Sequence, residues 1–133
     1  MTLVDTNVLI DLLKADPDWL HWSGPAFQHA QTAGPVGINV VVFAELVAHP
    51  LAPAKLDNFL ADLGLGFHHL SQETGRIAAL AFRQYRKRDG GKTGVLPDFF
   101  IGAQAAVEKW TLLTRDAKRY KTYFPDVALI APQ

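Results

Sequence analysis

The chain has 133 residues, of which 49% are hydrophobic, and its 13 basic and 13 acidic side chains give a formal net charge of zero. This length and composition predict a single domain over residues 1–133, because a chain of this size buries well over half of its unfolded surface in one core. The sequence contains no cysteine, which excludes disulfide bonds and thiolate metal ligands and is compatible with a reducing cytoplasm, where we expect the protein.

The charges are unevenly distributed along the chain. Residues 1–75 contain two Lys and eight Asp or Glu (net −6), whereas residues 76–121 contain eleven Lys or Arg and four acids (net +7). Such a basic segment is compatible with a phosphate-rich partner and equally with solvated helix surfaces. No run approaches the roughly 18 apolar residues of a membrane span, and no basic region followed by an apolar core marks a signal peptide, so we expect no membrane association.

Short apolar runs alternate with longer amphipathic segments. The runs typical of strands are residues 2–5, 36–41, 65–70, 110–114 and 127–130. The helical patterns are 6–15, 17–22, 27–33, a segment from about 42, 53–63, a segment from the cap at Ser71 to about 88, and 97–109. Gly24 and Pro25 are expected to break or kink the helix between 17 and 33. The alternation predicts an α/β fold in three α/β/α layers, with a mainly parallel five-stranded sheet and a ligand site beyond the carboxyl ends of its strands.

Four acidic residues fall where they can reach one edge of this sheet. Asp5 ends the first strand, Glu45 follows the second by about one helical turn, Asp98 stands at a helix start, and Asp116 comes two residues after the fourth strand. Four converging carboxylates repel one another and raise each other's pKa values, so such a cluster is stable at neutral pH around cations. Ligation by oxygen alone selects hard ions, which predicts Mg²⁺ with Mn²⁺ as a substitute.

A divalent ion held by a few carboxylates, with several waters left over, is what phosphodiester hydrolysis requires. The ion turns water into a nucleophile and neutralises charge in the transition state. Pro97 fixes the backbone that enters the helix displaying Asp98, and the strand at 110–114 holds Asp116 in place. The pattern therefore predicts a rigid acidic pocket for metal-dependent hydrolysis.

Four segments carry a resemblance to a known family. They are DTNVLIDLL at 5–13, VFAEL at 42–46, LPDFFIGAQA at 96–105 and LLTRDAKRYKTYFP at 112–125. Together they resemble the PIN-domain nucleases, specifically the VapC-type ribonuclease toxins of VapBC toxin–antitoxin pairs, over nearly the whole chain. The resemblance implies a PIN-like domain, Mg²⁺-dependent endonucleolytic cleavage of RNA, a cognate antitoxin protein as inhibitor, and a homodimer.

The resemblance also implies roles for individual residues. It implies a catalytic pocket formed by the four acids already described, in which Asp5 and Asp98 are the direct metal ligands. Supporting hydrogen bonds are implied for Thr6, Asn7 and Thr114.

Each of these residues also has a purely structural alternative. Asp5 is a suitable N-cap for the helix that begins at Thr6, and Asp116 a suitable turn residue. Asp98 at a helix start is favoured by the helix dipole. Glu45 lies in an apolar run where an unpaired carboxylate is costly, so it faces either water or a cation.

The basic segment near the C-terminus leaves similar alternatives open. Arg115 is a candidate for binding an RNA phosphate, with a solvated arginine as the alternative. Tyr120 and Tyr123 could stack on unpaired bases or pack against the core.

Other functional classes are less compatible with the sequence. The GGKTG sequence at 90–94 is no phosphate loop, because Arg86 stands where that motif needs glycine. The five histidines show no paired zinc spacing, and Asn7 stands where a phosphotransfer domain using Asp5 would place a second acid. Two alternatives remain: a non-catalytic PIN-like module that binds RNA or protein, and a related nuclease that acts on structured DNA.

Overall fold

A computed structural model of the chain describes residues 1–89 and 96–133, so the GGKTG sequence at 90–94 lies outside the described residues. Five strands form one sheet in the order β3-β2-β1-β4-β5, and all pairings between neighbours are parallel. The strands are β1 (Thr2–Val4), β2 (Val36–Ile38), β3 (Leu65–Phe67), β4 (Thr111–Leu113) and β5 (Leu129–Ile130). The predicted five-stranded sheet is confirmed, and it is parallel throughout.

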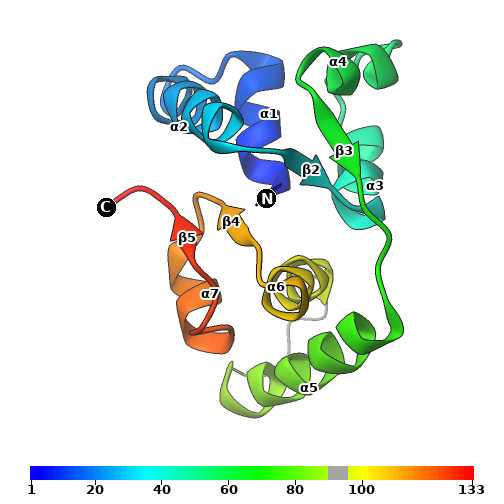
Figure 1. Ribbon diagram of the computed structural model, residues 1–133, viewed down its shortest axis with the longest axis vertical. Coiled ribbons are helices and arrows are strands. Elements are labelled where there is room, and N and C mark those ends of the chain that lie inside the picture. Colours follow the sequence, from blue (N-terminus) through cyan, green and yellow to red (C-terminus); the bar gives the residue numbers. More distant parts are fainter. Residues whose placement is uncertain (90–95) are drawn as a thin grey trace.

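Helices connect the strands and cover the sheet. They are α1 (Thr6–Lys14), α2 (Leu20–Ala33), α3 (Val40–Ala48), α4 (Leu56–Asp62), α5 (Gln72–Asp89), α6 (Leu96–Glu108) and α7 (Ala117–Tyr123). In Figure 1 the strands run between α1 and α2 on one side and α5 and α6 on the other. This is the three-layer α/β/α arrangement that the alternation of elements predicted.

The strand order reverses between β1 and β4. From the central β1 the chain moves outward through β2 to β3, and then crosses to β4 and β5 on the other side of β1. Ligands of open parallel sheets bind at such a reversal, beyond the carboxyl ends of the strands. Asp5 directly follows β1, and Thr114 directly follows β4. The backbone joins these two ends, because the amide of Asp5 donates to the carbonyl of Leu113 (2.9 Å).

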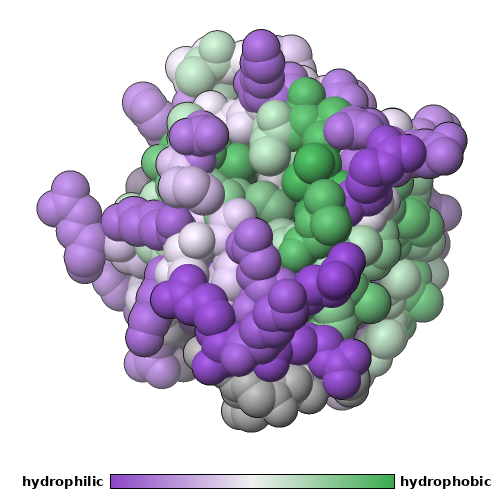
Figure 2. Space-filling view, turned by 90° about the horizontal axis from the view of Figure 1, so that it is seen from below, coloured by the Kyte–Doolittle hydropathy of each residue, from purple (hydrophilic) through white to green (hydrophobic). Residues whose placement is uncertain are grey.

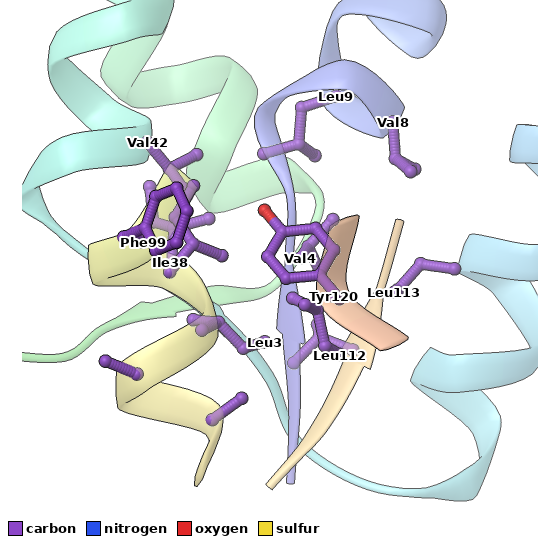
Figure 3. Packing of buried hydrophobic residues seen from close by; sticks show 14 of the residues in the cluster. Leu3, Val4, Val8, Leu9, Ile38, Val42, Phe99, Leu112, Leu113 and Tyr120 are labelled. Atoms are coloured by element: carbon purple, nitrogen blue, oxygen red, sulfur yellow. The ribbon is translucent and has the colours of Figure 1, made fainter. Parts of the chain in front are cut away.

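The core contains aliphatic side chains from β1, β4 and α1 and aromatic side chains from α6 and α7. Leu3, Val4, Leu112 and Leu113 are fully buried, as the two-sided burial of a parallel sheet requires. Tyr120 of α7 lies among these side chains, as Figure 3 shows. Of its two predicted alternatives, base stacking or core packing, Tyr120 therefore adopts core packing.

Helix α2 differs from the sequence prediction at both Asp16 and Pro25. The Asp16 carboxylate accepts hydrogen bonds from the amides of Asp18 (2.8 Å) and Trp19 (3.0 Å), which makes a turn, and the helix begins at Leu20 instead of at residue 17. Pro25 lies inside α2 and does not break it. Buried Ser23 and Phe27 anchor the helix to the core on either side of the proline, which offsets the missing backbone hydrogen bond.

The boundary between β2 and α3 was also predicted too late. The side-chain oxygen of Asn39 accepts a hydrogen bond from the Val42 amide (3.0 Å) and caps α3, while its amide group donates to Gln104 Oε1 (2.8 Å). The strand therefore ends at residue 38 and not at 41, although valines follow it. Glu45 consequently lies in the second turn of α3.

The remaining differences concern short elements. Helix α4 begins at Leu56 and β3 ends at Phe67, so both are shorter than predicted, and α7 was not assigned from the sequence. No helix in the described part of the chain is long and apolar enough to cross a membrane.

Candidate active site

Asp5 lies at the centre of a buried hydrogen-bond network. Its Oδ1 accepts from the Thr6 amide (2.7 Å), so Asp5 is indeed the N-cap of α1. Its Oδ2 accepts from the hydroxyls of Thr114 (2.7 Å) and Tyr120 (3.1 Å) and from Asn7 Nδ2 (3.3 Å). The helix cap uses Oδ1, and the hydrogen bonds of Oδ2 connect the end of β1 to the end of β4 and to α7. The capping role therefore leaves a second role open to the same carboxylate.

The carboxyl group of Asp5 is difficult to ionise. The pKa of Asp5 is raised from 3.8 to about 7, mainly by burial and also by the charge of Asp98, whereas the hydrogen bonds from Thr114, Tyr120 and Thr6 oppose this shift. Three donors thus fail to compensate for the loss of hydration. The same burial, together with the charge of Asp5, raises the pKa of Tyr120 well above its ordinary value, so its hydroxyl remains a donor. An additional cation would stabilise this carboxylate.

Glu45 approaches the same region from α3. Its Oε1 accepts a hydrogen bond from the Thr6 hydroxyl (2.7 Å). Thr6 therefore bridges two of the four acids, because its amide binds Asp5 and its hydroxyl binds Glu45. The carboxylate of Glu45 is therefore joined to the polar network around Asp5.

Asp98 and Asp116 both interact with the guanidinium group of Arg119. Asp98 lies in the first turn of α6, and its Oδ2 accepts a hydrogen bond from Arg119 Nη1, which is also 3.6 Å from Asp116 Oδ2. Burial raises the pKa of Asp98, and Arg119 opposes this shift while Glu45 and Asp116 reinforce it. Asp98 thus interacts electrostatically with each of the other three acids. The fold brings all four acids into one charged cluster at the end of the sheet.

Thr114 and Asn7 hold the loop after β4 against the start of α1. Thr114 is fully buried, and its hydroxyl accepts from the Asp116 amide (3.0 Å) while donating to Asp5. Asn7 Oδ1 accepts from the Arg115 amide (3.2 Å). Together with Thr6, these are the three residues that the resemblance assigned to pocket support, and each of them contacts a member of the acidic cluster or its loop.

Arg115 points to a different partner. Its Nε lies 2.9 Å from Oδ2 of Asp11, a fully buried acid of α1 that also accepts from the Ser23 hydroxyl (2.6 Å). The guanidinium carbon lies 4.7 Å from the centre of the Trp19 ring. The structure therefore places Arg115 in an ion pair within the protein, and its role in binding an RNA phosphate stays a prediction.

Sequence reasoning did not assign Arg119 and Tyr120 to the acidic cluster. Both lie on α7, three and four residues after Asp116, and on a helix this spacing brings side chains to the same face as the residue before the first turn. The signal was present in the sequence as Asp-x-x-Arg-Tyr but required α7 to be recognised as a helix.

The donor chemistry of the cluster fits a hard divalent cation. The four acids supply oxygen atoms only, and the buried Asp5 carboxylate lacks compensation, which a cation would provide. Among residues 1–89 and 96–133, no three acidic or histidine side chains are already arranged as a metal site. Arg119 pairs with Oδ2 of Asp98, so a cation that binds this oxygen must displace the arginine.

Two hollows adjoin the cluster. One, of about 330 Å³, is basic and lies between α5 and α7, where it is lined by Tyr85, Arg88, Asp116, Lys118, Arg119, Thr122 and Tyr123. The other, of about 290 Å³, is apolar apart from Glu45 and is lined by Val41, Ala44, Glu45, Leu96, Pro97 and Phe100. A larger hollow of about 630 Å³, between α3 and residues 52–58, contains none of the four acids. The acidic cluster is therefore reached from the two smaller hollows, which are lined by Asp116 and Glu45 respectively.

The basic hollow continues onto the α5 side of the molecule. The last turn of α5 contributes Arg86, Lys87 and Arg88, and Arg88 lies over the Tyr123 ring (5.9 Å). Seen from this side, hydrophilic side chains predominate and a band of hydrophobic residues runs between them (Figure 2). Tyr123 is half-buried and packs against Tyr85 and Phe99.

Comparisons with known proteins agree with this arrangement. A model of the PIN domain family matches residues 2–125. The fold is similar to that in a crystal structure of VapBC2 from Rickettsia felis bound to a promoter DNA fragment (TM-score 0.72, 20% identity, covering 99% of this chain and 98% of that one). It is also similar to a toxin–antitoxin complex from Klebsiella pneumoniae (TM-score 0.69, 22% identity, 100% and 98%). A third similar structure is VapBC-1 from nontypeable Haemophilus influenzae (TM-score 0.71, 13% identity, 98% and 96%). A search of curated proteins gives no match.

The sheet is open and parallel, its strand order reverses between β1 and β4, and acids lie at that reversal. These features place the chain among the α/β proteins that bind ligands at the carboxyl edge of the sheet. Within this class, the chain belongs to the PIN domain family. The PIN-domain part of the resemblance is thereby confirmed.

Proposed function

We propose that this PIN domain is a metal-dependent endoribonuclease that acts as the toxin of a type II toxin–antitoxin pair. The observation that carries the proposal is the convergence of Asp5, Glu45, Asp98 and Asp116 from four separate elements, with raised pKa values for Asp5 and Asp98. Strongly perturbed carboxylates clustered beside a hollow are typical of catalytic sites. Structural roles alone do not require four acids from separate elements to interact electrostatically.

In this proposal Asp5 and Asp98 hold Mg²⁺, or Mn²⁺ in its place, and Glu45 and Asp116 complete the acidic pocket. The ion, when bound, supplies charge neutralisation at the scissile phosphate and activation of water for attack on phosphorus. The residues around it have their own tasks. Thr114 and Tyr120 orient Asp5 through Oδ2, and Thr6 orients Glu45.

The substrate class follows from the charges beside the pocket. Arg88 and Lys118 line the hollow that adjoins Asp116, and such cations bind a phosphate backbone by releasing its counter-ions. RNA is proposed over DNA because of the resemblance to ribonuclease toxins. The similar structures of VapBC2, VapBC-1 and the Klebsiella complex support a toxin role with a cognate antitoxin. A homodimer in the cytoplasm belongs to the same proposal.

The test is cleavage by purified, antitoxin-free protein. Mixed pools of single-stranded RNA and matched DNA are incubated with the protein in Mg²⁺ or in chelator. The Asp98→Asn variant keeps the side-chain shape but removes the charge, and we expect cleavage of RNA to fall by orders of magnitude while folding persists. Asp62→Asn, at an exposed acid of α4 far along the chain from the cluster, is the matched control. Discrete RNA products that require both Mg²⁺ and Asp98 are the expected result.

One observation favours a second candidate, a PIN-like module that binds RNA or protein without cutting it. In the described residues no ready-made metal site exists, and Arg119 neutralises part of the acidic cluster. If the wild-type protein binds RNA but cuts neither pool with any divalent metal, this module replaces the nuclease.

A further inference from the structure

Arg119 pairs with Asp98, one of the two proposed metal ligands, and with the neighbouring Asp116. It donates to Oδ2 of Asp98 on α6 and lies 3.6 Å from Oδ2 of Asp116, three residues before it in the chain. About a quarter of its side chain is exposed. Among the ion pairs of residues 1–89 and 96–133, Arg119 is the only cation paired with any of the four acids.

This pairing places Arg119 in competition with a metal ion. The guanidinium lies against Oδ2 of both carboxylates, so a divalent cation that binds these oxygen atoms must displace it, and two cations at one carboxylate repel each other. The arginine supplies one positive charge to four carboxylates, so it compensates the cluster only in part. An ion of charge +2 compensates the cluster better, provided that the displaced arginine side chain has another favourable position.

The neighbouring basic hollow offers that place. Arg119 already lines it together with Lys118 and Arg88, and Asp116 stands at the boundary between the hollow and the acidic cluster. The long side chain of arginine reaches either region from the same backbone position. In the hollow its planar group of donors matches a phosphate, which two parallel N–H bonds can hold.

We propose that Arg119 is a displaceable counter-ion, which pairs with Asp98 and Asp116 in the metal-free protein and which a divalent cation releases to bind an RNA phosphate in the basic hollow. This inference rests on the proposed nuclease function. Its consequence is a positive coupling between metal and RNA, since the ion frees a group that the RNA needs and each ligand strengthens the binding of the other. The metal-free protein would keep its RNA site partly closed.

The first test measures metal affinity by titration calorimetry with Mg²⁺ and Mn²⁺. Arg119→Gln removes the competitor, so we expect the metal to bind roughly fivefold more tightly or better. Lys121→Gln makes the same change of charge on the same helix at an exposed residue that does not line the hollow, and it is expected to change the affinity much less. Arg119→Lys keeps the charge but loses the planar donor group. If Arg119→Lys also binds the metal more tightly than the wild type, the cause is the lost pairing with the carboxylates and not a change in net charge. This variant replaces Arg119→Gln in the test if Arg119→Gln does not fold.

The second test measures coupling by fluorescence anisotropy with a short single-stranded RNA whose linkages are phosphorothioates. Adding Mg²⁺ is expected to tighten RNA binding to the wild-type protein and to the Lys121→Gln control severalfold more than to Arg119→Gln. Equal metal affinity in wild type and Arg119→Gln, or equal tightening of RNA binding by the metal, overturns the inference and leaves the nuclease proposal standing. If the wild-type protein binds no divalent metal, both fall together.

Discussion

The hydroxyl of Tyr120 donates a hydrogen bond to Asp5 Oδ2 across 115 residues of sequence, over a distance of 3.1 Å. This contact ties the helix that carries Arg119 to the end of the central strand. Both partners are buried, Tyr120 to 1% and Asp5 to 4% exposure, so water cannot replace the bond if it is removed. The position of α7 and the ionisation of Asp5 are therefore linked.

The first prediction follows from that bond. Tyr120→Phe removes a donor that lowers the pKa of Asp5, so we expect this pKa to rise further and metal affinity at neutral pH to fall. The free energy of unfolding should decrease by about 1.5–3 kcal/mol, typical of a lost hydrogen bond to a charged group. Urea unfolding of Tyr120→Phe in the wild-type and Asp5→Asn backgrounds measures the loss in stability with and without the charged partner. A cost equally large in the Asp5→Asn background would contradict the linkage.

The second prediction concerns the pH dependence of stability. The folded-state pKa of Asp5 is about 7 and its ordinary value is 3.8, so between these values the folded protein binds more protons than the unfolded chain. The free energy of unfolding therefore falls as the pH rises through this window. The raised pKa of Asp98 acts in the same direction.

Asp5→Asn removes the contribution of that group. We expect the stability of the metal-free wild type, measured relative to Asp5→Asn, to fall by up to about 4 kcal/mol between pH 4 and pH 7.5. Chelator must be present, because a bound cation stabilises the ionised carboxylate and reduces this loss. Denaturant unfolding at a series of pH values provides the measurement, and parallel curves for the two proteins would disprove the burial effect.

The third prediction addresses Arg115 and its partner. Arg115→Gln leaves the fully buried Asp11 without its counter-ion, and breaking a buried ion pair from one side costs about 3 kcal/mol. The double variant Asp11→Asn with Arg115→Gln should recover a large part of that loss, because no uncompensated charge remains. Thermal unfolding of the single and double variants tests this. If Arg115 serves mainly to bind RNA, the single variant will be stable and will lose RNA affinity instead.

The fourth prediction tests the packing that positions α7. A Cβ atom on Gly102 of α6 would lie 2.5 Å from the Phe124 ring and 3.1 Å from the Tyr120 ring, so Gly102→Ala must displace these two rings from α6. We expect a loss of about 1–3 kcal/mol in stability and weaker RNA cleavage, because a displaced Tyr120 ring disturbs its hydrogen bond to Asp5. Gly75→Ala is the control, since its Cβ meets no atom within 4 Å on helix α5 and should stabilise the protein by roughly 0.5–1 kcal/mol.

Periodicity in the sequence was sufficient for the architecture and insufficient for several boundaries. Apolar runs and amphipathic segments alternate clearly enough to predict the sheet and its layers. Asn39 and Asp16 end or delay elements by side-chain hydrogen bonds to the backbone, and such bonds depend on local geometry that residue types only suggest. Helix α7 has seven residues, too few for its pattern to stand out from a turn.

Local sequence patterns were enough to bring the four acids to one edge of the sheet, because Asp5 and Asp116 follow parallel strands, Asp98 lies at a helix start and Glu45 lies on the helix after the second strand. Which groups meet these acids there depends on tertiary contacts. Arg119 pairs with Asp98, Tyr120 binds Asp5, and Arg115 turns instead to Asp11. The order of elements follows from local patterns of hydrophobicity. The partner of a charged side chain depends instead on burial and on contacts between residues far apart in the sequence, such as the 21 positions between Asp98 and Arg119 and the 115 between Asp5 and Tyr120.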